Sequence, residues 1–271
     1  MVRSLWTAAS GMIAQQNNVD TIANNLANVN TTGYKTEVAE FKSLLYQDIK
    51  AKSTSANSER KPIPSQVGLG VRNSAITSVF TQGAYLDSSN DLAFAIGGDG
   101  FFGVRGQDGN TYYTRNGNFV LATDTNGLAL TTTDGLKVLD AEGNPIIFDE
   151  SFVASQITVT GDGQICYPDD QNNPQPIGKE IGLWQFNNPS GLEKTDSGLF
   201  SESAASGAAM NEYTNNSLVR SELRQGYLEG SNVQVADEMV NMIVAQRAYE
   251  LNSKAIQASD EMMQQANNLR R

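Results

Sequence analysis

The sequence predicts an α+β protein. Discontinuous, long N- and C-terminal helices form a coiled-coil-like domain, and a central domain is mainly antiparallel β. Two patterns carry this prediction: apolar residues recur at intervals of seven near both ends, and turn-forming pairs recur every eight to ten residues between them. The expected divisions are a terminal helical assembly domain over 1–33 and 231–271, an extended connector over 34–75 and a β domain over 76–230.

The N-terminal pattern consists of apolar residues spaced by seven, at Leu5, Met12, Val19 and Leu26. This spacing predicts one helix of roughly 25 to 30 residues with an apolar seam. The helix should end at Thr31-Thr32-Gly33, where Gly33 is suited to the left-handed conformation that follows a last helical turn.

The C-terminal pattern has the same spacing, at Val235, Met242, Tyr249, Ile256 and Met263. It predicts a second helix of roughly 35 residues. Ser231 and Gln234 have the spacing of a capping box, which places the start of the helix at Ser231. Arg270 and Arg271 would lie near the negative end of its dipole.

Neither seam would hold an isolated helix, because Asn and Gln are frequent along the first one and Asn is a poor helix former. We therefore expect the ends to gain structure by packing on each other and on neighbouring subunits, with a two-helix coiled coil inside one chain as the alternative. Arg247, Glu250 and Lys254 form a charge ladder that is either solvated or paired across subunits. The expected assembly interface comprises Leu5, Met12, Val19, Asn24, Asn25, Leu26, Asn28, Val235, Met242, Arg247, Tyr249, Glu250 and Ile256.

The middle of the chain carries regularly spaced turn pairs, at Asp108-Gly109, Asn116-Gly117, Asn126-Gly127, Asp134-Gly135 and Glu142-Gly143. Such spacing is typical of antiparallel hairpins. Short β-prone runs lie between or after these turns, at 111–114, 118–121 and 156–160. Gly97-Gly98-Asp99-Gly100 is followed by apolar residues rather than a helix, so it is interpreted as a turn and not as a nucleotide-binding loop.

Composition excludes several chemistries. The chain has no His and a single Cys, Cys166, so it cannot build a Ser-His-Asp or Cys-His catalytic site or a His-ligated metal site. Acidic pairs at 149–150 and 169–170 leave a glycoside hydrolase formally open, because that chemistry needs only two carboxyl groups. The Asp residues of turns account for many of the acidic residues in this region, and a turn is the better explanation than a catalytic pair. We expect no catalytic residue, no cofactor and no bound metal.

The net charge of -11 argues against binding to nucleic acid, which needs a basic surface. The charge is uneven: residues 1–30 have a net charge of 0, 31–75 of +3, 76–232 of -13 and 233–271 of -1. Nearly neutral ends suit close packing, while the acidic middle stays in water. The stretch from Leu5 to Ala14 is too diluted by polar residues for a secretory signal, and no run is long enough to span a membrane.

Residues 23–35 read ANNLANVNTTGYK. This segment resembles the signature near the N-terminus of the bacterial flagellar rod and hook family. Ser231-Asn232-Val233 and Arg247-Ala248-Tyr249-Glu250 resemble its C-terminal helix, and 96–102, IGGDGFF, looks like the entry to its central β domain. The three matches occur in the expected order and frame the whole chain.

The resemblance implies a non-enzymatic axial subunit of the flagellar basal body that forms a helical homopolymer. Its implied partners are copies of itself, other rod proteins, the hook protein and the flagellar type III export apparatus, with no nucleic acid and no small-molecule substrate. It would be exported without a cleaved signal and assembled outside the cytoplasmic membrane. The length of the chain and the stretch 46–72 suit the distal rod, which transmits torque from the motor to the hook. The alternatives are an adjacent rod protein, a short hook protein, or a secreted β-rich hydrolase or adhesin.

Overall fold

The computed structural model describes residues 2–50, 65–124, 127–149, 152–169, 173–195, 198–215 and 217–269. The chain divides into two compact units, each built from separate stretches of sequence. Unit 1 comprises Met1–Ala27, Glu37–Thr77 and Gln234–Arg271, and unit 2 comprises Asn28–Thr36 and Ser78–Val233. The two units are described one after the other.

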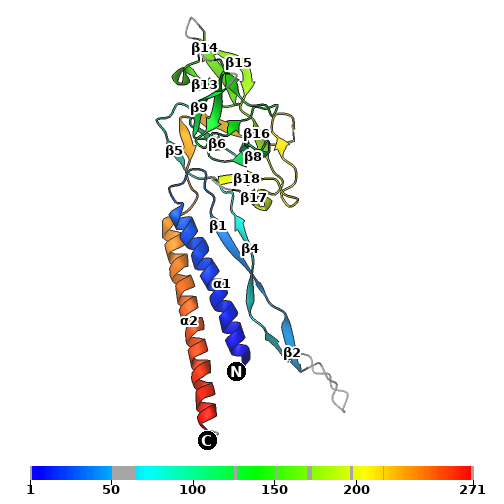
Figure 1. Cartoon of the computed structure of the whole chain (residues 1–271), viewed down its shortest axis with the longest axis vertical. Coiled ribbons are helices and arrows are strands. Elements are labelled where there is room, and N and C mark those ends of the chain that lie inside the picture. The colour runs from blue at the N-terminus through cyan, green and yellow to red at the C-terminus, as the bar shows by residue number, and fades with distance from the viewer. Residues whose placement is uncertain are drawn as a thin grey trace. The chain divides into compact units, whose positions relative to one another are not determined.

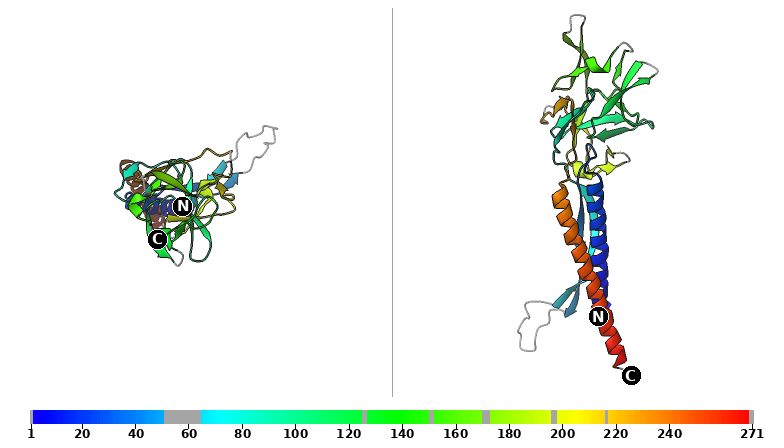
Figure 2. Two further views of the ribbon diagram at one scale, coloured as in Figure 1. Left: turned by 90° about the horizontal axis from the view of Figure 1, so that it is seen from above. Right: turned by 90° about the vertical axis from the view of Figure 1, so that its left-hand side faces the viewer.

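Unit 1 contains the two long helices, α1 (Val2–Ala27) and α2 (Val235–Asn268). They lie side by side and run in opposite directions, α1 in blue and α2 in orange to red (Figures 1 and 2). The predicted terminal helices are therefore confirmed, as are a left-handed Gly33 with φ of +71° and the α+β class as a whole. Arg270 and Arg271 lie outside the described residues.

The predicted ends of the helices need correction. α1 ends at Ala27 rather than at Thr31, because Asn28 begins a turn: its backbone oxygen accepts the Thr31 N–H at 3.1 Å and its Oδ1 accepts the Thr31 hydroxyl at 3.1 Å. The capping box at Ser231 is wrong as well. Gln234 is the N-cap and makes no side-chain cap bond. The Ser231 hydroxyl accepts the nearby Val233 N–H at 3.3 Å, so it bonds locally before the helix and does not cap it.

Extended strands complete unit 1. β1 (Glu37–Ser43) pairs with β4 (Val71–Ser78), and β2 (Tyr46–Lys50) pairs antiparallel with β3 (Ser65–Gly68). Residues 51–64 of the predicted extended connector lie outside the described residues. β4 contacts α1 at Ser10, whose hydroxyl accepts the Val71 N–H at 3.3 Å.

Unit 2 is a mainly antiparallel β structure. Its largest sheet has the order β12-β10-β11-β7-β8-β18-β17, with β16, β19 and β9 paired to its sides, and smaller sheets join β13-β14-β15, β20-β6 and β21-β5. Two short 3₁₀ helices span Ala154–Gln156 and Pro189–Gly191. The strands are β5 (Tyr85–Asp87), β6 (Phe94–Gly97), β7 (Phe101–Arg105), β8 (Thr111–Thr114), β9 (Phe119–Asp124), β10 (Gly127–Thr132), β11 (Lys137–Val138), β12 (Ile147–Phe148), β13 (Thr158–Val159), β14 (Gln164–Pro168), β15 (Pro174–Glu180), β16 (Leu183–Gln185), β17 (Glu193–Lys194), β18 (Leu199–Ser201), β19 (Met210–Asn211), β20 (Glu222–Gln225) and β21 (Tyr227–Glu229).

Most of the predicted turns join neighbouring strands. Asp108-Gly109 closes the β7–β8 hairpin, Asp134-Gly135 connects β10 to β11, and Glu142-Gly143 forms a tight turn after β11. Asn116-Gly117 is the exception, because β8 and β9 pair with other strands and not with each other. Gly117 is required there by a close approach: a Cβ atom on it would lie 1.9 Å from the backbone oxygen of Phe94. Asn126 lies outside the described residues.

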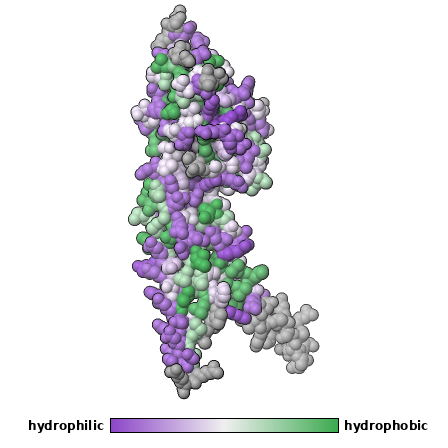
Figure 3. Space-filling model, viewed as in Figure 1, coloured by the Kyte–Doolittle hydropathy of each residue, from purple (hydrophilic) through white to green (hydrophobic). Residues whose placement is uncertain are grey.

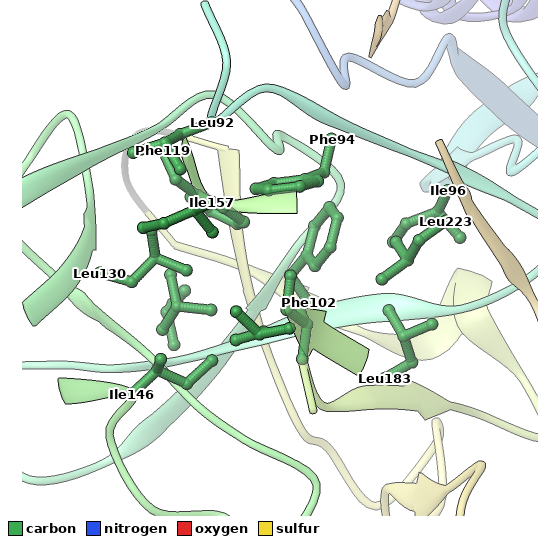
Figure 4. Packing of buried hydrophobic residues seen from close by; sticks show 14 of the residues in the cluster. Leu92, Phe94, Ile96, Phe102, Phe119, Leu130, Ile146, Ile157, Leu183 and Leu223 are labelled. Atoms are coloured by element: carbon green, nitrogen blue, oxygen red, sulfur yellow. The ribbon is translucent and has the colours of Figure 1, made fainter. Parts of the chain in front are cut away.

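The core of unit 2 is dense and aromatic. Leu92, Phe94, Phe102 and Phe119 are buried together with aliphatic residues from several sheets (Figure 4). The rings of Phe102 and Phe119 meet edge to face with centroids 5.0 Å apart, a favoured aromatic geometry. A second buried cluster in unit 2 contains Phe101, Tyr113 and Trp184, so two apolar clusters stabilise this unit.

Candidate assembly interface

The contact between the two helices is made by small and polar side chains. The hydroxyls of Ser4 and Ser259 lie 3.3 Å apart, and a Cβ atom on Gly11 would lie 2.9 Å from Nδ2 of Asn252. The Asn25 amide donates to Glu238 Oε2 at 3.2 Å. The residue numbers of each pair add up to 263, so the three contacts follow one antiparallel register with a spacing of seven or fourteen residues.

Asn25 is the most buried of the predicted interface residues, with 1% of its surface exposed. Its Oδ1 accepts the backbone N–H of Glu37 at 2.9 Å, and its Nδ2 donates to the backbone oxygen of Glu37 at 2.8 Å as well as to Glu238. The side chain therefore ties α1 to both α2 and β1. The structure assigns it a contact within one chain.

The apolar seam lies beside this contact line. Leu5, Met12, Val19 and Leu26 each follow a position of the line by one residue and are half-buried. On α2, Met242 and Ile256 are half-buried, whereas Val235 and Tyr249 keep 41% and 42% of their surface exposed. Val19, Tyr249 and Glu250 come together along a groove of about 370 Å³. The seam side chains thus retain surface for further partners.

The predicted polar residues fall into three environments. Arg247 and Glu250 form an exposed ion pair of 2.8 Å on α2, which is the solvated version of the charge ladder within this chain. Asn24 is exposed and donates to Glu37 Oε2 at 3.3 Å. Asn28 belongs to unit 2, where it shapes the turn after α1.

Both helices of unit 1 also carry exposed large apolar residues outside the predicted interface set. On α1 they are Trp6 and Ile13, with 72% and 62% of their surface exposed. On α2 they are Met239, Val240, Ile243, Val244, Leu251 and Met262, each more than half exposed. Figure 3 shows hydrophobic side chains among hydrophilic ones on the face of the helical unit turned to the viewer. In the sequence these residues are recognisable as apolar helix positions that lie off the seven-residue seam.

A second groove in unit 1, of about 270 Å³, lies where α1, β1 and α2 meet. Its apolar walls are Ile22, Val38, Phe41 and Val244, of which Val244 is 63% exposed and Val38 46%. Its charged lining groups are the carboxylates of Glu37 and Glu238. Asn18, Thr21 and Asn241 also line the groove, so its lining is about equally apolar and polar, and its only charges among the described residues are negative.

Unit 2 contains a buried ion cluster centred on Glu229. Its Oε1 accepts Lys35 Nζ at 2.6 Å, and its Oε2 accepts Arg115 at 3.2 Å; none of the three side chains is more than 1% exposed. Oε1 also accepts the Gly83 N–H at 3.0 Å, and the backbone oxygen of Glu229 accepts the Gly33 N–H at 2.8 Å. Burial lowers the pKa of Lys35, with a smaller contribution from the Arg115 cation, and Glu229 opposes this shift.

Asn232 completes this polar junction. Its Oδ1 accepts the backbone N–H and the hydroxyl of Thr36 at 2.7 and 2.8 Å, and its amide donates to the backbone oxygen of Val79 at 2.9 Å. The segment that leaves α1 and the segment that leads into α2 are therefore bound together inside unit 2. Lys35 and Asn232 both lie in the signature segments, which were the only sequence signal for this junction.

A pair of long terminal helices with exposed apolar side chains, joined in sequence to a densely packed β unit, is the architecture of a structural subunit. The comparisons with known proteins agree. Residues 5–35 match the family described as flagella basal body rod protein, 95–167 match the D1 domain of the flagellar hook protein FlgE/F/G, and 224–269 match the C-terminal region of the flagellar basal body rod FlgEFG proteins.

Full-length relatives are also found. The chain is 46% identical to the flagellar basal-body rod protein FlgG of Borreliella burgdorferi and 38% identical to that of Bacillus subtilis, with all of both chains covered in each case. It is 33% identical to the flagellar hook-basal body complex protein FlhP of Bacillus subtilis, again over both full chains. The chain belongs to the flagellar basal-body rod protein family.

This membership makes the chain a structural subunit of the flagellar basal-body rod and not an enzyme, which decides against the hydrolase alternative. The acidic pairs at 149–150 and 169–170 each include a residue outside the described part of the chain. No helix in the described ranges is long and apolar enough to cross a lipid bilayer.

Proposed function

We propose that the chain polymerises into the distal part of the rod and transmits torque from the motor to the hook. The observation that carries the proposal is the exposure of large apolar side chains on both helices of the pair, in a chain whose full-length relatives are named rod protein FlgG. Exposed apolar surface of this kind marks a protein interface. Copies of the chain are the main partner, and other rod proteins and the hook protein bind at the two ends of the polymer.

In this proposal α1 and α2 form an antiparallel coiled coil, supported by the common register of the Ser4–Ser259, Gly11–Asn252 and Asn25–Glu238 contacts. The 1–33 and 231–271 segments make the inner helical layer of a tube. The 34–75 connector braces neighbouring copies, and the acidic 76–230 region forms the outer wall. The apolar seam residues pack between copies, namely Leu5, Met12, Val19, Leu26, Val235, Met242, Tyr249 and Ile256.

The same proposal places the polymer in the cell envelope outside the cytoplasmic membrane, reached through the flagellar type III export apparatus without cleavage of a signal. The polar residues that dilute the apolar stretch 5–14 support this route, because a cleaved signal has a continuous apolar centre. A second candidate is another subunit of the rod and hook assembly. It is favoured by the 33% identity to the hook-basal body complex protein FlhP.

Replacing Leu26 or Ile256 with Asp is expected to block polymerisation of the purified chain and leave unit 2 folded. A carboxylate on the seam would have to be desolvated in every interface of the polymer, which raises the critical concentration by at least about tenfold, or ~1.4 kcal/mol. Sedimentation measures assembly, and near-ultraviolet circular dichroism measures the packing of unit 2. Gln257→Asp, an exposed neighbour of Ile256, is the matched control and should assemble normally. Normal assembly of both seam variants would overturn the proposed role of the seam.

A further inference from the structure

The groove between α1, β1 and α2 has the size of a site for side chains. At about 270 Å³ it is smaller than the usual 300–1,000 Å³ of a ligand pocket, so it suits one or two side chains better than a small molecule. Phe41 and Val38 of its wall are 37% and 46% exposed. A groove lined about equally by apolar and by polar side chains, with the Glu37 and Glu238 carboxylates among the polar ones, suits an apolar side chain that has a cation or a polar donor beside it.

The N-terminal turns of α1 have this chemistry. Trp6 is the most exposed aromatic residue that the structure describes in unit 1, and its indole N–H needs an acceptor when buried. Arg3 is the one basic residue of α1 and lies a single turn before Trp6, while Ile13 lies seven residues after it, so the three project from one region of the helix. Tryptophan and arginine are the residues most enriched at the energetic centres of protein interfaces.

Trp6 cannot fill the groove of its own chain. The groove is lined by Asn18, Thr21 and Ile22 of α1, and sixteen residues of a helix separate Ile22 from Trp6 by about 24 Å. On α2, Val244 lies level with Val19 in the common register, which places it about 20 Å along the helix from the level of Trp6. A Trp6 side chain that fills this groove therefore belongs to a second copy, displaced along the helix axis.

We propose that Trp6 of one copy, with Arg3 beside it, inserts into the groove lined by Ile22, Val38, Phe41 and Val244 of the next copy, and that Arg3 pairs with the Glu37 and Glu238 carboxylates. This inference rests on the proposed self-assembly and names its contact. The Trp6 surface and the groove are different surfaces, so each copy carries both and can bind one neighbour through each. A contact of this heterologous kind that also carries an axial displacement generates an open helical polymer rather than a closed dimer.

Disulfide cross-linking tests the contact in the full chain. Trp6→Cys and Val244→Cys are made separately in a Cys166→Ala background, which removes the native buried thiol. The variants are mixed above the raised critical concentration that is expected once the Trp6 indole is removed. After assembly and mild oxidation, the mixture should give linked pairs containing one of each, whereas each variant alone should stay unlinked. A chain carrying both cysteines should give a ladder of linked oligomers, because its own two sites are too far apart for a disulfide. Trp6→Cys mixed with the exposed control Gln257→Cys should not link.

A second measurement uses no new thiol. Trp6→Ala should raise the critical concentration at least tenfold, while Gln257→Ala, at an exposed polar position of α2, should change it less than twofold. If the unmodified chain polymerises but the Trp6 and Val244 cysteines do not link, or Trp6→Cys links to itself, this contact is wrong and self-assembly stands. If the unmodified chain does not polymerise under any tested condition, the proposed self-assembly fails, and this contact fails with it.

Discussion

Glu229→Ala is expected to lower the free energy of unfolding of unit 2 by about 3 to 5 kcal/mol, which is a large part of the stability of a typical domain. The carboxylate is fully buried and is held by Lys35, Arg115 and the Gly83 N–H. Its removal leaves two cations in the interior without their shared partner. The unpaired charges, rather than the lost pair energy, account for the size of the effect.

The measurement is urea unfolding followed by the fluorescence of Trp184, with Trp6 replaced by Phe so that only unit 2 reports. The matched control is Glu222→Ala, whose carboxylate is 63% exposed and pairs with Arg224, so its loss should cost less than about 1 kcal/mol. A combined replacement of Lys35 and Arg115 by Met and Glu229 by Leu should recover most of the stability, since it removes all three charges together. Equal stability of Glu229→Ala and Glu222→Ala would contradict this account of the cluster.

Asn25→Leu is expected to destabilise the helical pair by about 3 kcal/mol. Leucine keeps most of the volume of the side chain but can neither accept the Glu37 N–H nor donate to the Glu37 oxygen and the Glu238 carboxylate. Hydrogen exchange of the α1 amides measures the effect, because it reports local opening of this helix apart from the unfolding of unit 2.

Asn24→Leu is the control for that change. Asn24 is exposed one position away on the same helix, and its contact with Glu37 Oε2 is long at 3.3 Å, so protection of α1 should change by less than about 0.5 kcal/mol. If both leucine variants lower the protection of α1 equally, the stabilising role assigned to the Asn25 hydrogen bonds is wrong.

The sequence pattern predicted the helices better than their contact. The seven-residue seam was sufficient to locate α1 and α2 because any amphipathic helix must repeat its apolar face. It did not show that Ser4, Gly11 and Asn25, one position before the seam, form the line between the helices. Small residues allow close approach, and polar ones can pair across a narrow contact, but neither property produces a hydrophobic pattern.

The β region shows the same limit. Asp134-Gly135 was predictable because its turn chemistry is local and joins two strands that pair. Asn116-Gly117 has equally good turn chemistry, yet its flanking strands pair elsewhere, since strand pairing depends on residues far along the chain. The Lys35, Arg115 and Glu229 cluster was beyond sequence patterns for this reason: 80 and 114 residues separate its members.

The most direct test of the account is electron microscopy of basal bodies isolated from the source bacterium after deletion of the gene. The proposal predicts a truncated rod without hook or filament, restored when the gene is returned. A complete rod that lacks only its hook would favour a hook subunit and contradict the distal rod assignment. Intact flagella in the deletion strain would contradict the central claim that this chain builds the distal rod.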